Sequence, residues 1–359
     1  MEFIIKTKII CGDNGVKIIN DLNPKKIFFV TDPYMVKSGM LQKILDYFSK
    51  EIEYKVFTDV KPDPSQELVD KAILEYRDFK AEVVVALGGG SAIDLAKAMI
   101  YGLLKEVKPL FVAIPTTAGT GSEVTNFAVI TRGLDKVVLI DDALFPDYAL
   151  LIAELTKTVP NFITADTGMD VLTHAIEAYV SKNASDFSDV FAIEAMKLVF
   201  KHLKTVYDDG LRMKSREAML KASCMAGIAF TNAGLGINHS LAHTIGGRFH
   251  VAHGRLNAIL LPHVIRYNIK KSDLTFKKLT LLVHELGLNS IDEFIELIEK
   301  LCYGLDIPSK LSQLNKIDSN EYYAQIDDMA MIALNDRCTP SNPAVVVKFD
   351  LANILRDIF

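Results

Sequence analysis

Asp170 and His174 lie four residues apart in the segment TGMDVLTHAIEAYV, which has a helical pattern. Side chains at this spacing project from one face of a helix, one turn from each other, as metal ligands can. Four of the chain's eight histidines follow within fifteen residues of one another: His239, His243, His250 and His253. Imidazoles together with a carboxylate suit iron or zinc better than calcium or magnesium, which prefer oxygen ligands. Because no CxxC pair lies beside them, we predict a metal with a position open to substrate, not a structural zinc site.

The cluster has a second interpretation, which is a hydrogen-bonded polar network without metal. Burying several imidazoles and a carboxylate without partners costs several kcal/mol, which a metal offsets by neutralising the carboxylate and satisfying the nitrogens. We therefore favour the metal. Spacing alone does not select every ligand, because His239 and His243 are also four residues apart and form an equally good helical pair.

The composition is that of a globular protein with a large core. At 359 residues the chain exceeds the length that one core usually supports, so we expect two domains. Half of the residues are hydrophobic and 24% are charged. The formal net charge is −5 and no basic run is interleaved with aromatic residues, which argues against nucleic-acid binding. No apolar run approaches the length of a membrane span.

The cysteines are widely scattered, at Cys11, Cys224, Cys302 and Cys338. Four cysteines with no close pair, in a chain of this size, do not indicate a disulfide framework. The N-terminal segment MEFIIKTKII also lacks the pattern of a secretory signal. We expect the protein to work in the reducing cytoplasm.

Over about the first 150 residues, short β-branched runs alternate with amphipathic helical stretches, which is typical of βαβ units around a mostly parallel sheet. The predicted strands lie in KKIFFVTD, EYKVFTD, AEVVVALGGG, LFVAIPTT and KVVLIDD, while ITRGLDK reads as a surface turn. After Pro160 the strand signals fade, and apolar residues recur at spacings of three and four, which predicts helices. The sequence therefore predicts an α/β domain over residues 1–157 and an all-α, metal-binding domain over residues 158–359.

The segment VVVALGGGSAIDLAKA reads as a buried strand, a triple-glycine turn and a helix. The turn is Gly88, Gly89 and Gly90; Ser91 is predicted to cap the helix, and Asp94 to favour its positive end. A pyrophosphate fits such a helix start. The segment is not the G-x-G-x-x-G fingerprint, so a purely structural turn is an equally good interpretation.

A second loop, IPTTAGTGSEVTNF, follows the next predicted strand. It offers hydroxyl groups and bare backbone amides to phosphate or ribose, through Thr116, Thr117, Thr120, Ser122 and Thr125. The alternative is an ordinary polar turn that caps the element after it.

Asp32 ends the strand that contains IFFVT. A carboxylate there can accept hydrogen bonds from an adenosine ribose and repel a 2′-phosphate, which favours NAD over NADP. Its other interpretation is a turn residue before Pro33.

Taken together, these segments resemble the iron-containing (group III) alcohol dehydrogenases over nearly the whole chain. The resemblance rests on FVTD, FTDVKPDPS, ALGGGSAIDLAKA, IPTTAGTGSEVT, ITADTGMDVLTHAIEAYVS, GINHSLAHTIGGRFHVAHGRLNAILLPHVIRYN and TPSNP. Within the family, NASDFSDVFAIEAMKLVF and GLGINHSLAHTIGGRFHVAHG look most like the short 1-propanol dehydrogenases of bacterial propanediol-utilisation microcompartments.

The resemblance implies a ligand set of Asp170, His174, His239 and His253, with His243 left free near nicotinamide and substrate. It implies an N-terminal Rossmann-like domain, a C-terminal helical domain and an active site in the cleft between them. The residues that it implies for the dinucleotide site are Asp32, Gly88, Gly89, Gly90, Ser91, Asp94, Thr116, Thr117, Thr120, Ser122 and Lys136.

The implied activity is that of an NAD(H)-dependent alcohol dehydrogenase or aldehyde reductase with Fe²⁺, or Zn²⁺ in its place, acting on short primary alcohols such as 1-propanol and on aldehydes such as propionaldehyde. We expect His243 to relay the proton, since histidine titrates near neutral pH; a structural hydrogen bond is its other interpretation.

Three alternatives stay open. One is a zinc-dependent polyol dehydrogenase of the glycerol type. Another is a dehydroquinate-synthase-like lyase, which needs a basic cluster where we find only Arg248 and Arg255. The third is a non-catalytic protein, which explains neither the glycine turn nor the threonine loop.

Expected partners are a small aldehyde or alcohol and further copies of the chain in a homodimer or higher homo-oligomer. We expect neither nucleic acid nor membrane as a partner. A bacterial microcompartment, with its shell or cargo proteins, is a second setting that the resemblance allows beside the open cytoplasm.

Overall fold

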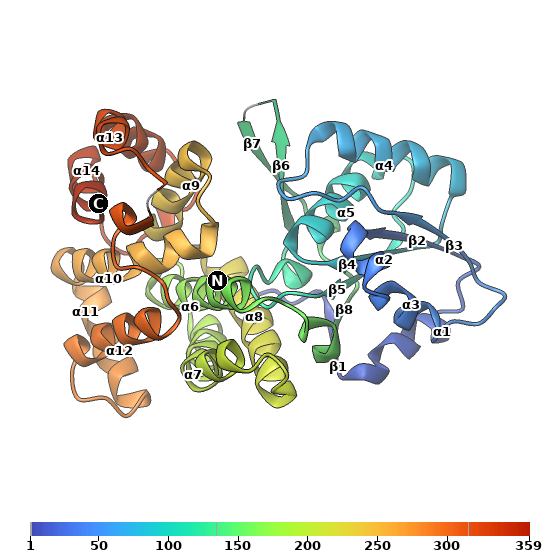
Figure 1. Ribbon diagram of the computed structural model, residues 1–359, viewed down its shortest axis with the longest axis horizontal. Coiled ribbons are helices and arrows are strands. Elements are labelled where there is room, and N and C mark those ends of the chain that lie inside the picture. Colours follow the sequence, from blue (N-terminus) through green and yellow to red (C-terminus); the bar gives the residue numbers. More distant parts are fainter. Residues whose placement is uncertain (1, 134, 315) are drawn as a thin grey trace. The chain divides into compact units, whose positions relative to one another are not determined.

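The computed structural model describes residues 2–133, 135–314 and 316–359, which form two compact units (Figure 1). The N-terminal unit comprises residues 4–159, and the C-terminal unit comprises residues 160–359 together with Glu2 and Phe3. Across the described residues, no helix has the length and apolar character needed to cross a membrane.

A parallel sheet is the centre of the N-terminal unit (Figure 1). Within the described residues its strand order is β1-β8-β5-β4-β2-β3. The strands are β1 (Lys8–Cys11), β2 (Lys26–Thr31), β3 (Glu53–Phe57), β4 (Val83–Gly88), β5 (Leu110–Pro115) and β8 (Tyr148–Leu151). The chain turns from β2 to β3 on one side and places β4 on the other, so the strand order reverses between β2 and β4, where open parallel sheets commonly bind ligands.

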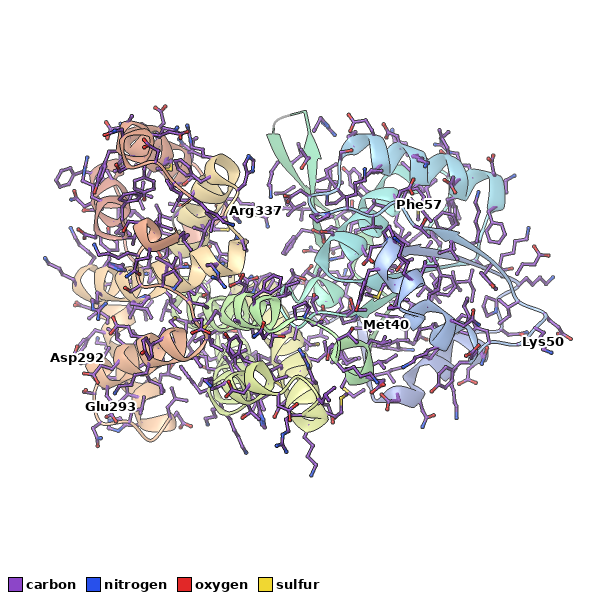
Figure 2. The ribbon with its side chains drawn as sticks, viewed as in Figure 1. Met40, Lys50, Phe57, Asp292, Glu293 and Arg337 are labelled. Carbon is purple, nitrogen blue, oxygen red and sulfur yellow. The ribbon has the colours of Figure 1, made fainter. Side chains whose placement is uncertain are left out.

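Both faces of the sheet are buried, because successive residues of a strand point to opposite faces. In β2, Phe28 enters one core and Phe29 the other, and both are fully buried. Figure 2 labels one further residue of each core, Phe57 in the first and Met40 in the second. The first core is covered by α4 (Gln66–Phe79) and α5 (Gly90–Leu103), and the second by α1 (Lys17–Asp21), α2 (Pro33–Lys37) and α3 (Met40–Leu45). Continuous apolar strands such as VVVALG are the sequence signature of this arrangement.

One predicted strand is placed wrongly by the sequence analysis. The KVVLIDD segment does not join the parallel sheet, because β7 (Asp135–Ile140) pairs antiparallel with β6 (Phe127–Arg132) in a separate sheet (Figure 1). The predicted turn ITRGLDK is wrong at both ends, which lie in these two strands, but Gly133 is in a turn; Leu134 lies outside the described residues. β1, β6 and β8 have no counterpart among the predicted strands.

The C-terminal unit is helical, as predicted. Its helices are α6 (Asn161–Val180), α7 (Asp186–Asp208), α8 (Met213–Ala233), α9 (Ile237–Phe249), α10 (His253–Lys271), α11 (Asp273–Glu285), α12 (Ile291–Gly304), α13 (Ser319–Leu334) and α14 (Lys348–Asp357). Polar side chains cap several of them; Ser185, for example, forms a capping box with Ser188 at the start of α7. The predicted combination of a Rossmann-like parallel-sheet unit and an all-α unit is confirmed.

Helix α6 is the central helix of this unit. It packs against α7, α8, α10 and α11, and every residue from Gly168 to Val180 is buried. A helix buried on all sides is normally apolar throughout. The polar side chains of α6 must therefore find partners inside the protein, and these side chains build the site.

Candidate functional site

One stripe of α6 carries the acidic and imidazole side chains of the site. Asp170, His174 and Glu177 follow one another at spacings of four and three residues, so they share a face of the helix. His239 lies in the first turn of α9, and His253 is the first residue of α10. Two helix starts thus meet the middle of one buried helix.

A close approach at Gly254 brings α10 onto α6. A Cβ added to Gly254 would lie 2.0 Å from the carbonyl oxygen of Asp166, so a larger residue does not fit. Arg255 Nε donates to Asp166 Oδ1 at 2.9 Å across the same contact. As a result, His253 Nε2 lies 3.5 Å from Asp170 Oδ1.

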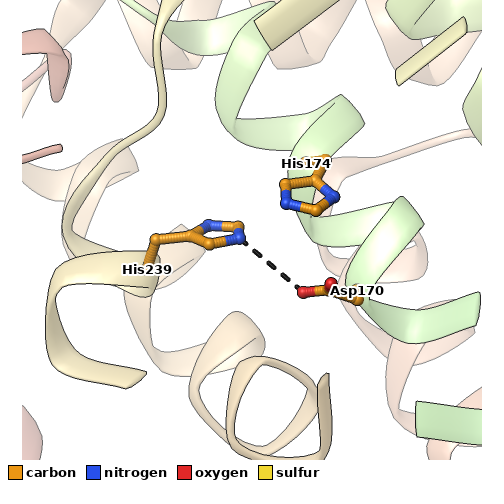
Figure 3. Close-up of side chains that lie close together, drawn as sticks. All are labelled: Asp170, His174 and His239. Atoms are coloured by element: carbon orange, nitrogen blue, oxygen red, sulfur yellow. Dashed lines mark ion pairs between the residues drawn. The ribbon is translucent and has the colours of Figure 1, made fainter. Parts of the chain in front are cut away.

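The predicted metal ligands come together at this point. Figure 3 shows Asp170, His174 and His239, with the ion pair between His239 Nε2 and Asp170 Oδ1 at 3.7 Å. One potential ligand atom from each of these three residues lies within 4.8 Å of the others. The rings of His174 and His239 stack with centroids 4.6 Å apart, and the ring of His253 lies 5.2 Å from that of His239.

These distances fit a metal centre. In a tetrahedral site with metal–ligand bonds of about 2.1 Å, neighbouring ligand atoms lie about 3.4 Å apart. The separations of 3.5 and 3.7 Å between Asp170 Oδ1 and the two imidazole nitrogens are close to that value. One carboxylate oxygen and three imidazole nitrogens form a donor set suited to iron or zinc.

Asn257 Nδ2 marks the point on which three of the donor atoms converge. It lies 2.7 Å from Asp170 Oδ1, 3.1 Å from His253 Nε2 and 3.2 Å from His239 Nε2. The amide NH₂ is a pure donor, so the atoms around it present lone pairs to one position. That is the arrangement a cation requires, and the residues present fit a divalent transition metal.

The electrostatics of the site agree with its donor set. Asp170, His174 and His239 are 5%, 6% and 1% exposed. Burial alone would raise the pKa of Asp170, but the surrounding imidazoles outweigh it and hold that pKa far below its usual range. Burial would lower the pKa of His239, yet Glu177 and Asp170 raise it to about 9. The carboxylates of Asp170 and Glu177 therefore stabilise a positive charge between them.

His243, the predicted proton relay, lies one turn of α9 beyond His239. Its ring stacks on that of His253 with centroids 5.3 Å apart, and its side chain is 40% exposed. His243 Nδ1 lies 2.9 Å from Asp336 Oδ2, while Asp336 Oδ1 accepts hydrogen bonds from Ser240 Oγ and the backbone N–H of Cys338. His250 is exposed at the C-cap of α9, outside this group.

Most of the predicted nucleotide-binding residues lie at or just after the carboxyl ends of β2, β4 and β5. Thr31 is in register with Leu87, and Gly88 with Pro115, so the segments that follow these strands start side by side. Asp32 caps α2, where its Oδ1 accepts from the backbone N–H groups of Tyr34 and Met35.

The glycine turn packs against the threonine loop. A Cβ on Gly89 would lie 3.1 Å from Thr117 Oγ1, and one on Gly90 would lie 2.8 Å from Thr120 Cγ2. A Cβ on Gly88 would lie 3.7 Å from Asp32 Oδ2. A side chain at Gly90 would displace Thr120, so glycine there allows the close packing that leaves the backbone of the turn beside Asp32 and the threonines.

The prediction that Ser91 caps α5 is wrong. The helix begins at Gly90, its N-cap is Gly89, and no side chain caps it, so Ser91 lies inside the first turn. Thr116, which starts the threonine loop, is buried, and its backbone N–H donates to the carbonyl of Gly88.

Asp94 lies one turn beyond the start of α5 and joins an internal network instead of the helix end. Its two oxygens accept from Ser122 Oγ at 2.7 Å and from the backbone N–H of Val129 at 3.0 Å. The neighbouring Lys97 is fully buried and donates to Ser122, Thr125 Oγ1 and a backbone carbonyl. The hydrogen bond from Ser122 to Asp94 therefore holds the threonine loop against α5.

Lys136 lies on β7 of the hairpin and pairs with Asp63 at 2.6 Å, with both side chains largely exposed. The charge of Lys136 also opposes the burial that raises the pKa of Asp94, and its role at the dinucleotide site stays a prediction.

Sequence reasoning missed three residues of the site. Glu177 lies seven residues after Asp170 on the same stripe of α6, and Asn257 lies four residues after His253 on α10, so helical spacing was an available signal for both. Asp336 is 93 residues from His243, and no local pattern announces it.

Comparison with known proteins agrees with the geometry. The family model described as "Iron-containing alcohol dehydrogenase" matches residues 6–153, and "Fe-containing alcohol dehydrogenase family, C-terminal" matches residues 164–359. The chain is 38% identical to the 1-propanol dehydrogenase PduQ of Citrobacter freundii over 376 residues, covering 99% of each. It is 37% identical to the NADPH-dependent butanol dehydrogenase of Clostridium saccharobutylicum, covering 100% of this chain and 98% of that protein.

Among solved structures, the sulfoacetaldehyde reductase from Bifidobacterium kashiwanohense, a complex with NAD⁺, superimposes with a TM-score of 0.91. The two chains are 29% identical, and the match covers 99% of this chain and 98% of that one. The chain therefore belongs to the iron-containing alcohol dehydrogenase family, as its motifs predict, and is an alcohol dehydrogenase.

Proposed function

We propose that the enzyme interconverts short primary alcohols and aldehydes, with 1-propanol and propionaldehyde as the expected pair, using NAD(H) and one Fe²⁺. The ligands of the metal would be Asp170, His174, His239 and His253. The observation that carries this proposal is the convergence of Asp170 Oδ1, His239 Nε2 and His253 Nε2 on one point, at 2.7–3.2 Å from Asn257 Nδ2. The similarity to a 1-propanol dehydrogenase supports the choice of substrate.

When bound, the divalent metal supplies Lewis acidity toward the substrate oxygen, and the nicotinamide supplies the hydride chemistry. The protein's own proton path begins at His243. Asp336 is an acceptor when ionised, so His243 Nδ1 donates to it at 2.9 Å and His243 Nε2 is left as the basic atom. Because the imidazole is 40% exposed, it can exchange the alcohol proton with solvent.

For the nucleotide, we propose that the glycine turn receives the pyrophosphate and that Asp32 accepts from the adenosine ribose. Asp32 uses Oδ1 to cap α2, while its Oδ2 lies toward Gly88, on the side of the turn. A carboxylate at this position disfavours the 2′-phosphate of NADP. Thr117 and Thr120 lie against the same turn and are the hydroxyl groups that we assign to the phosphates.

The test is a panel of C2–C4 alcohols and aldehydes, assayed with NAD(H) and NADP(H) on chelated protein reloaded separately with Fe²⁺ and Zn²⁺. We expect activity to return with Fe²⁺ and to be highest with the C3 pair and NAD(H). If chelated and Fe²⁺-loaded samples oxidise alcohols equally well, the proposal is wrong.

A zinc-dependent polyol dehydrogenase of the glycerol type is the second candidate, because the same donor set also suits zinc. Higher activity with glycerol and Zn²⁺ in the panel would select it. The lyase has less support. Arg248 lies 4.0 Å from the carboxylate of Asp328 and Arg255 lies 2.9 Å from that of Asp166, so neither offers an unpaired cation to an anionic substrate.

We further propose a homo-oligomer that works in the cytoplasm, with a bacterial microcompartment as the second setting. The resemblance to microcompartment 1-propanol dehydrogenases is what supports the second setting. Light scattering during size-exclusion chromatography tests the oligomer, and a monomer would refute it. Co-purification with shell proteins would favour the microcompartment.

A further inference from the structure

Glu177 contacts the proposed metal ligand His239 at Nδ1, the ring nitrogen on the side away from Asp170. Its side chain is 4% exposed, and both of its oxygens are used. Oε2 lies 2.5 Å from His239 Nδ1, and Oε1 accepts from the backbone N–H of Asn238 at 2.7 Å. Neither interaction belongs to the helix on which Glu177 lies.

The start of α9 is built around this carboxylate. A Cβ added to Gly236, the N-cap of α9, would lie 2.7 Å from Glu177 Oε1 and 2.8 Å from Asn342 Oδ1, so a larger residue would displace these two side chains. The distance from Glu177 to His239 is therefore fixed by backbone packing as well as by the hydrogen bond.

The contact decides which nitrogen of His239 faces the metal. An ionised carboxylate only accepts, so His239 Nδ1 must carry a proton. His239 Nε2 is the atom on the side of Asp170, 3.7 Å from its Oδ1. A metal ligand needs a lone pair, and Glu177 leaves that lone pair on Nε2.

The same network extends to the carboxylate ligand. Asn238 Nδ2 donates to Asn257 Oδ1 at 2.9 Å, which turns the amide NH₂ of Asn257 toward Asp170 Oδ1. Glu177 holds the backbone of Asn238, so one buried carboxylate supports two of the four proposed ligands.

We infer that Glu177 is a positioning residue for the metal, which sets the tautomer of His239 and strengthens it as a ligand. This inference rests on the proposed metal centre. Hydrogen bonds of this kind commonly change metal affinity by about 10–100-fold.

The test is the Glu177→Gln variant of the full-length protein. Glutamine has one acceptor oxygen for two N–H donors. If that oxygen keeps Asn238, the amide NH₂ faces His239 Nδ1 and moves the ring proton to Nε2, toward the site. We expect the dissociation constants of Zn²⁺ and Co²⁺, measured by chelator competition, to rise about 10–100-fold and the Co²⁺ absorption spectrum to change.

Thr173→Val is the matched control. Thr173 is fully buried on the same helix, and within the part of the chain that the structure describes its hydroxyl donates to the carbonyl of Met169 in that helix. We expect this variant to bind both metals as the wild type does. If Glu177 is merely structural, Glu177→Gln will lower the melting temperature of the metal-free protein but leave the metal affinities at the wild-type value, and the inference is wrong.

A measurement on the wild type covers the case in which Glu177→Gln does not fold. In the Zn²⁺-loaded protein, ¹H–¹⁵N correlation of the histidine rings should show His239 protonated at Nδ1. Protonation at Nε2 would overturn the inference. Wild-type protein that binds neither metal would refute the metal centre itself, whereas tight binding by both wild type and Glu177→Gln would refute only the role of Glu177.

Discussion

Asn257 donates a hydrogen bond from Nδ2 to Asp170 Oδ1 across 2.7 Å, from the second turn of α10 to the buried middle of α6. The same nitrogen lies 3.1 and 3.2 Å from the Nε2 atoms of His253 and His239. In the metal-free protein, this amide is a hydrogen-bond donor to the buried carboxylate of Asp170.

Asn257→Asp should therefore destabilise the metal-free protein much more than the metal-loaded one. The variant puts a second carboxylate oxygen beside Asp170, where a donor has been. We expect the free energy of unfolding without metal to fall by about 1–3 kcal/mol, and saturating metal to restore at least part of it. Thermal unfolding with chelator and with Zn²⁺ measures both states.

The control is Asn268→Asp, on the same helix. Asn268 forms a reciprocal amide pair with Asn342, at 3.2 and 2.9 Å, away from the proposed ligands. Metal should stabilise this variant no more than it stabilises the wild type. Equal destabilisation of Asn257→Asp with and without metal would contradict the proposed centre.

His243→Ala should lower kcat for alcohol oxidation by about 10²–10⁴-fold, the usual contribution of a general base, with metal content unchanged. His250→Asn is the comparison, since this exposed histidine has a left-handed backbone, with a φ of 51°, that asparagine tolerates. Steady-state kinetics together with metal analysis separate the two effects. Wild-type kcat and an unchanged pH–rate profile in His243→Ala would reject the relay.

Asp32→Asn should weaken the preference for NAD over NADP by about tenfold, the equivalent of ~1.4 kcal/mol of lost charge repulsion. Asparagine caps helices as well as aspartate does, so α2 should keep its stability. Asp141→Asn is the matched control, because Asp141 also accepts from a backbone N–H, that of Ala143. The ratio of kcat/KM for the two nucleotides is the readout, and an unchanged ratio would remove Asp32 from the nucleotide site.

Glu123→Gln should change how stability depends on pH. Glu123 is 1% exposed, and its Oε1 has no hydrogen-bond partner among the described residues. Burial raises its pKa from 4.5 to about 7, although Lys97 opposes the change. Neutral Glu123 thus stabilises the fold fully below pH 4.5, and this stability is lost as the pH rises through about 7.

Glutamine stays neutral at every pH, so the variant should gain on the wild type as the pH increases. We expect similar melting temperatures near pH 5 and an advantage for Glu123→Gln of about 2–3 kcal/mol at pH 8. Glu51→Gln, at an exposed position, should give the same difference from wild type at both pH values. A constant difference in Glu123→Gln would show that Glu123 does not titrate in this range.

The sequence predicts the fold where local pattern and tertiary structure agree. The apolar runs of β2, β4 and β5 are buried on both faces, and this makes them readable as strands of a parallel sheet. The sequence does not predict which strand pairs with β7. A β-branched run has the same pattern whether it pairs with β6 in a hairpin or joins the main sheet. β1 and β8 contain four residues each, too few to establish a period.

The sequence also predicts part of the candidate site. Asp170, His174, His239 and His253 are of types that bind metal, and the structure brings them together. Ser91 has a residue type that often caps helices, but the cap of α5 lies two residues earlier, at Gly89, where the glycine turn packs against Thr117. The partner of His243 comes from beyond α13, which only tertiary structure reveals.

All four proposed ligands, together with Glu177 and Asn257, belong to residues 160–359. The N-terminal unit, which contains the glycine turn, contributes none of these proposed ligand atoms. If these assignments hold, the ion and the dinucleotide bind through residues of different units. We therefore expect a variant with a damaged Rossmann-like unit to keep its affinity for the metal, so that metal content alone would be a poor measure of active enzyme.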